Sequence, residues 1–313
     1  MSQNEPPFIN SPDMQQGLPP FFFEELEIRT FYLKADPSRL AAWCDTFLNV
    51  SDNYRFRPLL PLVVLGINSY PVMRTLHPGM SQLGFTNQNE YYLMFPVLML
   101  ERILGLWLPR SVSWAYPYIG VDNASSAFTG QEVLGFRKML GNISFETDTA
   151  TGKFKSTVAM PGFAALGQNQ AQEMLPVLRV ETGAPLANPG TAALAGPWAG
   201  LALNEMEGLV ETAVLHLLEA FDPGLFTVIN LKQFRDGFRP EKAVYQSLVR
   251  CSFRQIGTQP PTVYDGATIS IVDNVTISAA ATLGIGANPT PLLVTGYKTD
   301  MWFGDIETLW AAN

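Results

Sequence analysis

One lysine stands in an environment that suits chemistry on a carbonyl group. The neighbours of Lys138 are apolar residues and two glycines: Leu134, Gly135, Phe136, Met139, Leu140 and Gly141. A lysine amine attacks a carbonyl carbon only when it is neutral, whereas an unperturbed lysine has a pKa of about 10.4. Burial among apolar side chains disfavours the ammonium form and so activates the amine. The spacing alone is also typical of a lysine at a strand end whose stem covers apolar surface.

Other common catalytic arrangements lack their residues. Only two histidines are present, His77 in a Pro-Gly loop and His216 at the edge of an apolar helix face, and no His-x-x-x-His or Cys-x-x-Cys spacing occurs. A zinc site therefore has too few ligands, and a serine triad has no histidine base near a Gly-x-Ser-x-Gly turn. Gly284 and Gly286 are not followed by the third glycine of a dinucleotide fingerprint. We expect no metal and no cofactor.

Short runs of apolar and β-branched residues predict the strands that position Lys138 and the rest of the chain. They predict strands over residues 21–31, 59–67, 91–100, 114–122, 142–147 and 153–160, with short β-rich runs over 268–283. Asp36-Pro37 predicts a helix start, and an apolar face predicts a second helix over 204–221. Segments 74–89 and 162–197 are predicted to be mostly loop. The pattern favours a β-dominated α+β fold built on a curved antiparallel sheet or β-barrel with flanking helices.

Composition excludes several classes of protein. The chain has 313 residues, of which 47% are hydrophobic and 15% charged, with a net charge of −8 and two cysteines. It is therefore neither disordered nor a disulfide scaffold, and Cys44 and Cys251 are expected as reduced thiols in the core. The chain has no run of basic residues, so nucleic-acid binding is not expected. The most apolar stretch, residues 91–108, is interrupted by Pro96, Glu101 and Arg102, so no membrane span is expected.

The predicted organisation is one domain over residues 20–313. Residues 1–19 contain no apolar signal core and are expected to form a partly disordered lead-in. We expect a cytoplasmic protein.

Several motifs resemble those of the acetoacetate decarboxylase-like superfamily. Gly130-Gln131-Glu132 followed by Gly135-Phe136-Arg137-Lys138-Met139 is similar to the family's Gly-Arg-Glu and aromatic-Pro-Lys-Lys motifs. Tyr116-Pro117-Tyr118 with Val121-Asp122, the pattern Tyr32, Asp36 and Leu40, and Glu90 six residues before Pro96 also match. The resemblance covers residues 20–160. Segments 231–234 and 243–246 match longer superfamily members more weakly.

The resemblance implies roles for individual residues. Lys138 corresponds to the lysine that forms a Schiff base with a ketone, and Glu90 to an acidic pocket residue that moves protons or holds the structure together. The implied substrate contacts are Met139, Phe136, Leu26, Tyr116 and Gln131. The resemblance also implies that the chain has the curved β fold of this superfamily and forms a homo-oligomer.

Three of these residues depart from the family pattern. Met139 replaces the second lysine, Leu26 the substrate-binding arginine and Gln131 the arginine of Gly-Arg-Glu. Arg29 is three residues from Leu26, an offset that puts it on the other face of a regular strand. Lowering the pKa of Lys138 by about three units requires roughly 4 kcal/mol. Because Met139 supplies no ammonium next to Lys138, desolvation of the lysine must provide this free energy.

The resemblance predicts an enzyme that forms an imine between Lys138 and an oxo-acid or related carbonyl compound. Decarboxylation, aldol cleavage, dehydration and cyclisation all remain open, and the missing cations favour a larger, more hydrophobic substrate than acetoacetate. The alternative is a non-catalytic protein that binds a hydrophobic carbonyl ligand.

Overall fold

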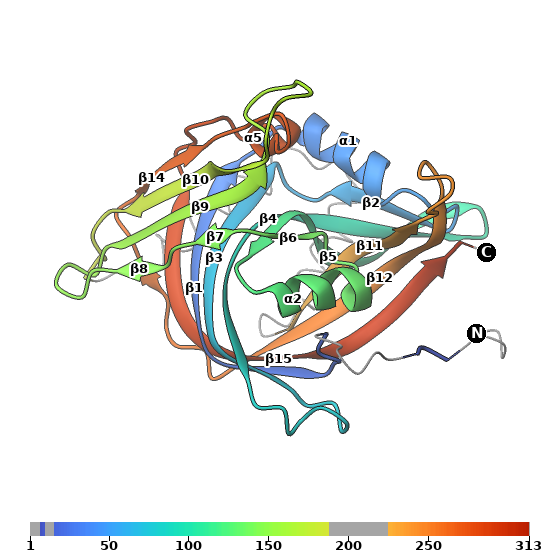
Figure 1. Cartoon of the computed structure of the whole chain (residues 1–313), viewed down its shortest axis with the longest axis horizontal. Coiled ribbons are helices and arrows are strands. Elements are labelled where there is room, and N and C mark those ends of the chain that lie inside the picture. The colour runs from blue at the N-terminus through green and yellow to red at the C-terminus, as the bar shows by residue number, and fades with distance from the viewer. Residues whose placement is uncertain (1–6, 10–15, 188–224, 313) are drawn as a thin grey trace.

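Strands dominate the computed structural model, which describes residues 7–9, 16–187 and 225–312. They form two sheets, a large one that curves through the whole molecule and a small one beside it (Figure 1). The β-dominated α+β class with a curved sheet is confirmed.

The large sheet closes on itself. Its order is β2 (Tyr54–Pro58), β4 (Thr86–Ile103), β3 (Leu62–Thr75), β1 (Phe21–Lys34), β15 (Leu293–Ala311), β12 (Ala243–Ile256), β11 (Leu225–Arg235), β5 (Leu106–Val121) and β6 (Lys138–Leu140). A short strand, β13 (Thr262–Val263), pairs with β15. Because β4 also pairs with β5, the path from β4 through β11 to β5 returns to its start. Most pairs are antiparallel, but β5 runs parallel to both β11 and β6.

The small sheet packs against one outer face of the large sheet. It contains β14 (Ala267–Ile271), β10 (Glu173–Thr182), β9 (Phe154–Gly162) and β7 (Asn142–Ile143), with β8 (Glu146–Thr147) paired to β9. Val158 and Met160 of β9 join Tyr91 and Phe95 of β4 in the largest apolar cluster. The main core therefore lies between the two sheets.

Alternation along β4 separates this core from the interior of the closed sheet. Tyr91 and Phe95 face the core, whereas Glu90 and Tyr92 face inward and line a cavity. Successive residues of a strand point to opposite faces, so one strand supplies both the packing and the polar residues of the site.

Short helices cover the ends of the sheets. α1 (Pro37–Phe47) starts at Asp36, whose carboxylate accepts hydrogen bonds from the backbone N–H groups of Ser38 and Arg39 at 2.8 and 3.4 Å. Pro37 occupies the first helical position, where a missing N–H costs nothing. α2 (Ala124–Thr129) runs directly into a π-helical turn, η1 (Gly130–Leu134), and α5 (Ala279–Leu283) lies near α1 (Figure 1).

The structure corrects some predicted elements. In the described part of segment 162–197, which was predicted to be mostly loop, residues 173–182 alternate and pair with β9 as β10. The end of 268–283 forms α5 instead of a β run, since alanines favour a helix and Asp273 accepts hydrogen bonds from two backbone N–H groups of that helix. Loop 74–89 is shorter than predicted, because β3 ends at Thr75 and β4 begins at Thr86.

The outcomes for the two cysteines and for the second predicted helix differ. Cys44 and Cys251 are buried free thiols, as predicted, and burial raises the pKa of each to about 12. The predicted helix 204–221, with His216, lies outside the described residues. In the described part of the chain, no helix is long and apolar enough to cross a membrane.

Candidate active site

A cavity of about 640 Å³ lies inside the closed sheet. Its described lining comes from β1, β3, β4, β5, β6, β11, β12 and β15, from α2 and η1, and from residues 80–85 and 16–17. Closure of the sheet is what gathers side chains from both halves of the chain around one space.

Lys138 enters this cavity from the short strand β6. β6 runs parallel to β5, with Lys138 opposite Ile119 and Met139 opposite Gly120. The stem of Lys138 passes over Gly130, where a Cβ atom would lie 2.6 Å from Cδ of the lysine. The glycine at the junction of α2 and η1 therefore makes room for the lysine, and π-helical turns of this kind are common at functional sites.

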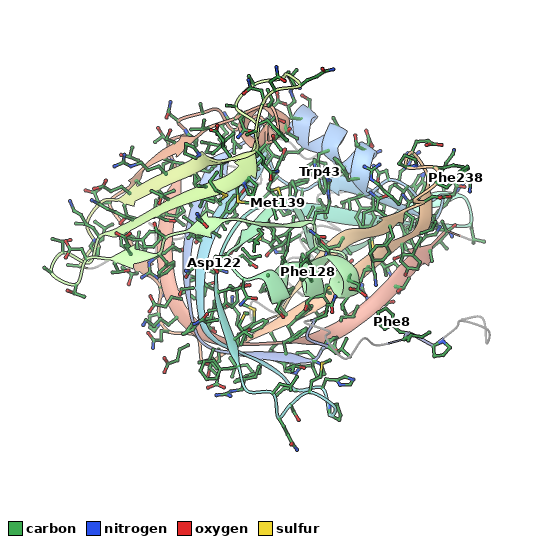
Figure 2. The ribbon with its side chains drawn as sticks, in the orientation of Figure 1. Phe8, Trp43, Asp122, Phe128, Met139 and Phe238 are labelled. Atoms are coloured by element: carbon green, nitrogen blue, oxygen red, sulfur yellow. The ribbon has the colours of Figure 1, made fainter. Side chains whose placement is uncertain are left out.

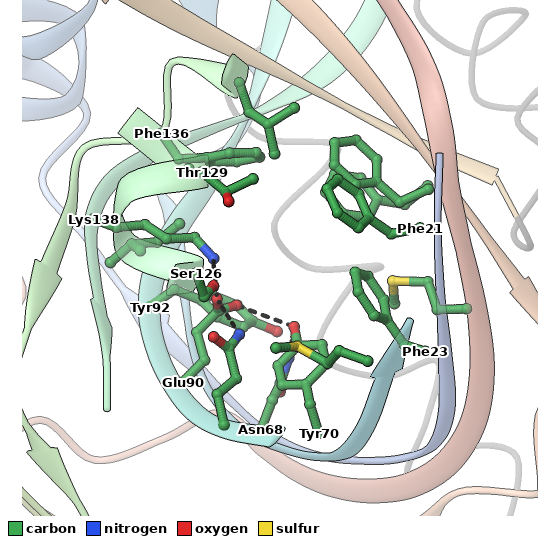
Figure 3. A pocket seen from close by; sticks show the side chains of 18 of the residues that line it. Phe21, Phe23, Asn68, Tyr70, Glu90, Tyr92, Ser126, Thr129, Phe136 and Lys138 are labelled. Atoms are coloured by element: carbon green, nitrogen blue, oxygen red, sulfur yellow. Dashed lines mark hydrogen bonds and ion pairs between the residues drawn. The ribbon is translucent and has the colours of Figure 1, made fainter. Parts of the chain in front are cut away.

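The Lys138 amine lies against a carboxylate. Nζ of Lys138 is 3.0 Å from Oε2 of Glu90 and 3.0 Å from Oγ of Ser126 (Figure 3). The side chains of Lys138 and Glu90 are only 11% and 8% exposed. A proton thus has a short path between amine and carboxylate in a largely water-excluded place.

Neighbouring polar groups hold Glu90 in position. Tyr70 donates from its hydroxyl to Oε1 of Glu90 at 3.1 Å, and Gln88 donates from Nε2 to Oε2 at 3.2 Å. Asn68 in turn donates from Nδ2 to the Tyr70 oxygen at 3.1 Å. With Lys138, three donors surround the carboxylate, so its orientation toward the amine is fixed.

Three tyrosines of the cavity remain neutral donors. Burial, reinforced by the charge of Glu90, raises the pKa of Tyr70 and of Tyr116 well above the ordinary value. Burial also raises the pKa of Tyr92, with Tyr116 adding to the effect. The cavity therefore offers phenol O–H groups and no phenolate.

The structure brings four of the predicted site residues together. Lys138, Glu90, Phe136 and Tyr116 all line the cavity, and the rings of Phe136 and Tyr116 meet edge to face at 5.9 Å. Nζ of Lys138 lies 5.9 Å from the centre of the Phe136 ring.

The other three predicted contacts lie outside the cavity lining. Met139 packs against the main core, because it follows Lys138 on a strand and points to the opposite face (Figure 2). Leu26 is fully buried and does not line the cavity itself, but it packs in a cluster with the lining residues Ile28 and Tyr70. Gln131 is exposed and donates from its side chain to the backbone oxygen of Lys138, so it braces the lysine without facing a substrate.

Arg29 is placed on the opposite face of β1, as its offset predicts. Its guanidinium lies 5.6 Å from the ring centres of both Phe145 and Phe154, and its Nη2 lies 3.5 Å from a carboxylate oxygen of Glu27. It therefore belongs to the packing between the sheets and does not take over the role of a cavity arginine.

Sequence reasoning missed Ser126 and the pair Asn68 and Tyr70. The alternation of Asn68 and Tyr70 along β3 was a usable signal, because residues two apart share one face. Ser126 gave no such signal, since its helix reaches Lys138 only through the fold.

The end of the predicted lead-in also reaches the cavity. Gln16 donates to a carboxylate oxygen of Glu132 at 2.8 Å, and the backbone N–H of Gly17 donates to Oγ1 of Thr129 at 2.9 Å. Gln16 and Gly17 both line the cavity.

Across the described residues, no group of three or more His, Cys, Asp and Glu side chains is arranged to hold a metal ion.

Comparisons with known proteins identify the fold. No family model and no curated protein matches the sequence. Among solved structures, acetoacetate decarboxylase from Legionella pneumophila superposes with a TM-score of 0.61 at 13% identity, covering 99% of this chain and 93% of that one. The chain has the acetoacetate decarboxylase-like fold. The resemblance read from the sequence is thus confirmed at the level of the fold.

Other solved structures with this fold are similarly distant. An acetoacetate decarboxylase-like enzyme from Sphingomonas wittichii gives a TM-score of 0.58 at 13% identity, covering 93% of this chain and 92% of that one. The enduracididine biosynthesis enzyme MppR gives a TM-score of 0.55 at 12% identity, covering 95% of this chain and 90% of that one. This chain is therefore a divergent example of the acetoacetate decarboxylase-like fold.

Proposed function

We propose that the protein is an enzyme that forms an imine between Lys138 and a carbonyl substrate. The observation that carries the proposal is the position of the Lys138 amine, in a cavity and 3.0 Å from the Glu90 carboxylate. The acetoacetate decarboxylase-like fold supports it, because the neighbours with this fold are named as enzymes.

The pair can carry out imine formation without an outside base. The Lys138 ammonium gives a proton to Glu90, and the neutral amine attacks the carbonyl carbon. One amine proton then moves to the alkoxide, and the Glu90 carboxylic acid protonates the departing hydroxyl, which leaves as water. The products are an iminium ion, one water molecule and the Glu90 carboxylate.

The iminium then acts as an electron sink. It can accept the electron pair left by loss of CO₂, by aldol cleavage or by removal of an α-proton, with Glu90 as the proton acceptor in the last case. The neighbours span this range, since one group is named acetoacetate decarboxylase and MppR has been solved with pyruvate and with a condensation product of pyruvate and an aldehyde. We propose carbon–carbon lyase or aldol-type chemistry for this chain.

Borohydride trapping tests the proposal. Incubation with pyruvate, acetoacetate or a simple ketone and sodium borohydride reduces an imine to a stable amine. Peptide mass mapping is expected to locate the adduct at Lys138. If Lys138→Ala traps as much ligand as the wild-type protein, the proposal is wrong.

The second candidate is a binding protein for a hydrophobic carbonyl ligand. The ion pair between Lys138 and Glu90 favours it, because the amine is engaged by a carboxylate at 3.0 Å and is not free to attack a carbonyl group. In that case ligands bind reversibly and no borohydride adduct forms at Lys138.

A further inference from the structure

Four neighbouring strands place a phenylalanine at the same level of the cavity wall. Phe226 of β11 is opposite Phe253 of β12, Phe253 is opposite Phe303 of β15, and Phe303 is opposite Phe21 of β1. The ring centres are 4.9, 4.3 and 5.8 Å apart and the planes differ by 5°, 7° and 14°. Phe23 continues the row at 6.3 Å and 12°. We call these five residues the phenylalanine ladder.

Two members of the ladder, Phe253 and Phe23, lie next to residues that contact Lys138 or Glu90. Phe136 lies 6.2 Å from Phe253 and 5.9 Å from the amine of Lys138. Phe23 lies 5.3 Å from Tyr70, whose hydroxyl donates to Glu90. Figure 3 shows Phe21 and Phe23 across the cavity from Lys138. Phe136 therefore bridges the amine and the ladder, so a molecule bonded to Lys138 can extend along Phe136 to the ladder.

The charge of the cavity is balanced before any substrate enters. Among the described lining residues, Lys138 carries the one positive charge and Glu90 the one negative charge, and no arginine or histidine lines the wall. After imine formation with an uncharged carbonyl compound, the iminium again balances the Glu90 carboxylate.

A substrate carboxylate would disturb this balance. It would add a second negative charge to a space that already holds Glu90, and like charges in a low-dielectric site disfavour each other strongly. Arg29, the nearest arginine in sequence to the family position, is held between the sheets by Phe145 and Phe154.

We infer that the site takes an uncharged ketone or aldehyde with an apolar, preferably aromatic, end, whose carbonyl group meets Lys138 while that end packs on the phenylalanine ladder. The inference rests on the proposed function for the covalent step. It excludes β-keto acids as preferred substrates, and it leaves aldol, dehydration or cyclisation chemistry through an enamine. In that enamine step the α-proton passes to Glu90 and its electron pair forms the new C=C bond, while the electrons of the C=N bond return to nitrogen.

A pair of matched compounds tests the charge preference. 4-Phenylbutan-2-one and 2-oxo-4-phenylbutanoate share a skeleton, but the second carries a carboxylate in place of a methyl group. For each, the concentration that half-saturates borohydride trapping at Lys138 is measured, with trapping by n-butylamine as the reference for intrinsic reactivity. After this correction, we expect the ketone to saturate the site at a concentration at least about tenfold lower. Equal or better saturation by the oxo acid would overturn the inference.

Acetone and two ladder variants test the apolar end. We expect acetone to need an at least about tenfold higher concentration than 4-phenylbutan-2-one. Phe253→Ala is expected to remove most of the difference between the two ketones, and Phe226→Leu serves if Phe253→Ala does not fold. Phe234→Ala is the matched control, because Phe234 lies on β11 but is exposed outside the cavity. A difference that persists in both ladder variants would contradict a role for the ladder.

Reversible binding separates this inference from the proposed function. 4-Phenylbutan-2-ol and 4-phenylbutanoate form no imine. Their binding is followed through the tryptophan fluorescence of the protein, since Trp114 lines the cavity. If no carbonyl compound is trapped but the alcohol binds more tightly than the acid, the ligand class stands and the enzyme proposal falls. If compounds are trapped but the acid binds more tightly than the alcohol, the enzyme proposal stands and the ligand class is wrong.

Discussion

A methyl group on Gly130 would lie 2.6 Å from Cδ and 3.0 Å from Cε of Lys138. Carbon atoms that are not bonded do not approach so closely, so the lysine can occupy its present path only because residue 130 is glycine. The turn between α2 and β6 and the position of the amine are thereby coupled.

Gly130→Ala is expected to displace the amine and to slow borohydride trapping by about 100-fold, because small misplacements of a reacting group have effects of this size. The control is Gly237→Ala, since an added Cβ at Gly237 meets no atom within 4 Å. Trapping by Gly130→Ala at the wild-type rate, in protein with an unchanged circular dichroism spectrum, would show that the lysine does not depend on this glycine.

Glu90→Gln tests whether Glu90 moves protons in the imine pathway. Glutamine keeps the shape of Glu90 but cannot take a proton, so exchange of the ketone's α-hydrogens in D₂O is expected to slow by about 100-fold or more. The exchange is followed by NMR with a ketone that the wild-type protein traps. Adduct formation at Lys138 is expected to continue more slowly, because water must then carry the protons that Glu90 moves during imine formation. Unchanged exchange would leave Glu90 with a structural role.

Met139→Lys restores the second lysine of the family but is not expected to activate Lys138. Met139 points away from the cavity and packs against the main core, so a lysine there loses hydration. We expect a loss of about 2 kcal/mol or more in the free energy of unfolding, measured with urea. Met174→Lys, at an exposed position of β10, is the control. Faster trapping by Met139→Lys with unchanged stability would mean that the residue reaches the cavity.

Alkaline pH is expected to destabilise the protein through buried tyrosines. Burial raises the pKa of Tyr91, a core residue that is 3% exposed. In the unfolded chain this phenol loses its proton near pH 10, whereas in the folded protein it keeps it. The contribution to stability is therefore complete below pH 10 and falls at higher pH, by up to about 1.4 kcal/mol per pH unit.

Urea unfolding at pH 9, 10 and 11 measures this effect. Tyr91→Phe is expected to show a shallower loss of stability between pH 10 and 11 than the wild-type protein. Tyr245→Phe, at an exposed position of β12, is expected to keep the wild-type slope. The same slope in all three proteins would show that Tyr91 does not contribute.

The sequence by itself determined the local features of the protein. Asp36-Pro37 specified the start of α1, and the apolar segment with its family resemblance singled out Lys138. Apolar and β-branched runs specified the strands around residues 21–31, 59–67, 91–100, 114–122 and 153–160. The sequence also put Arg29 on the face away from the site. These features depend on backbone geometry and on residues a few positions apart.

Only the tertiary structure decided what surrounds Lys138. Phe21 and Phe303 are at opposite ends of the chain, and they face each other because β1 and β15 pair in one register. Met139 was expected beside the substrate, but the pairing of β6 with β5 turns it toward the core. Such contacts follow from strand pairing and sheet closure, which are long-range and leave no short-range signal in the sequence.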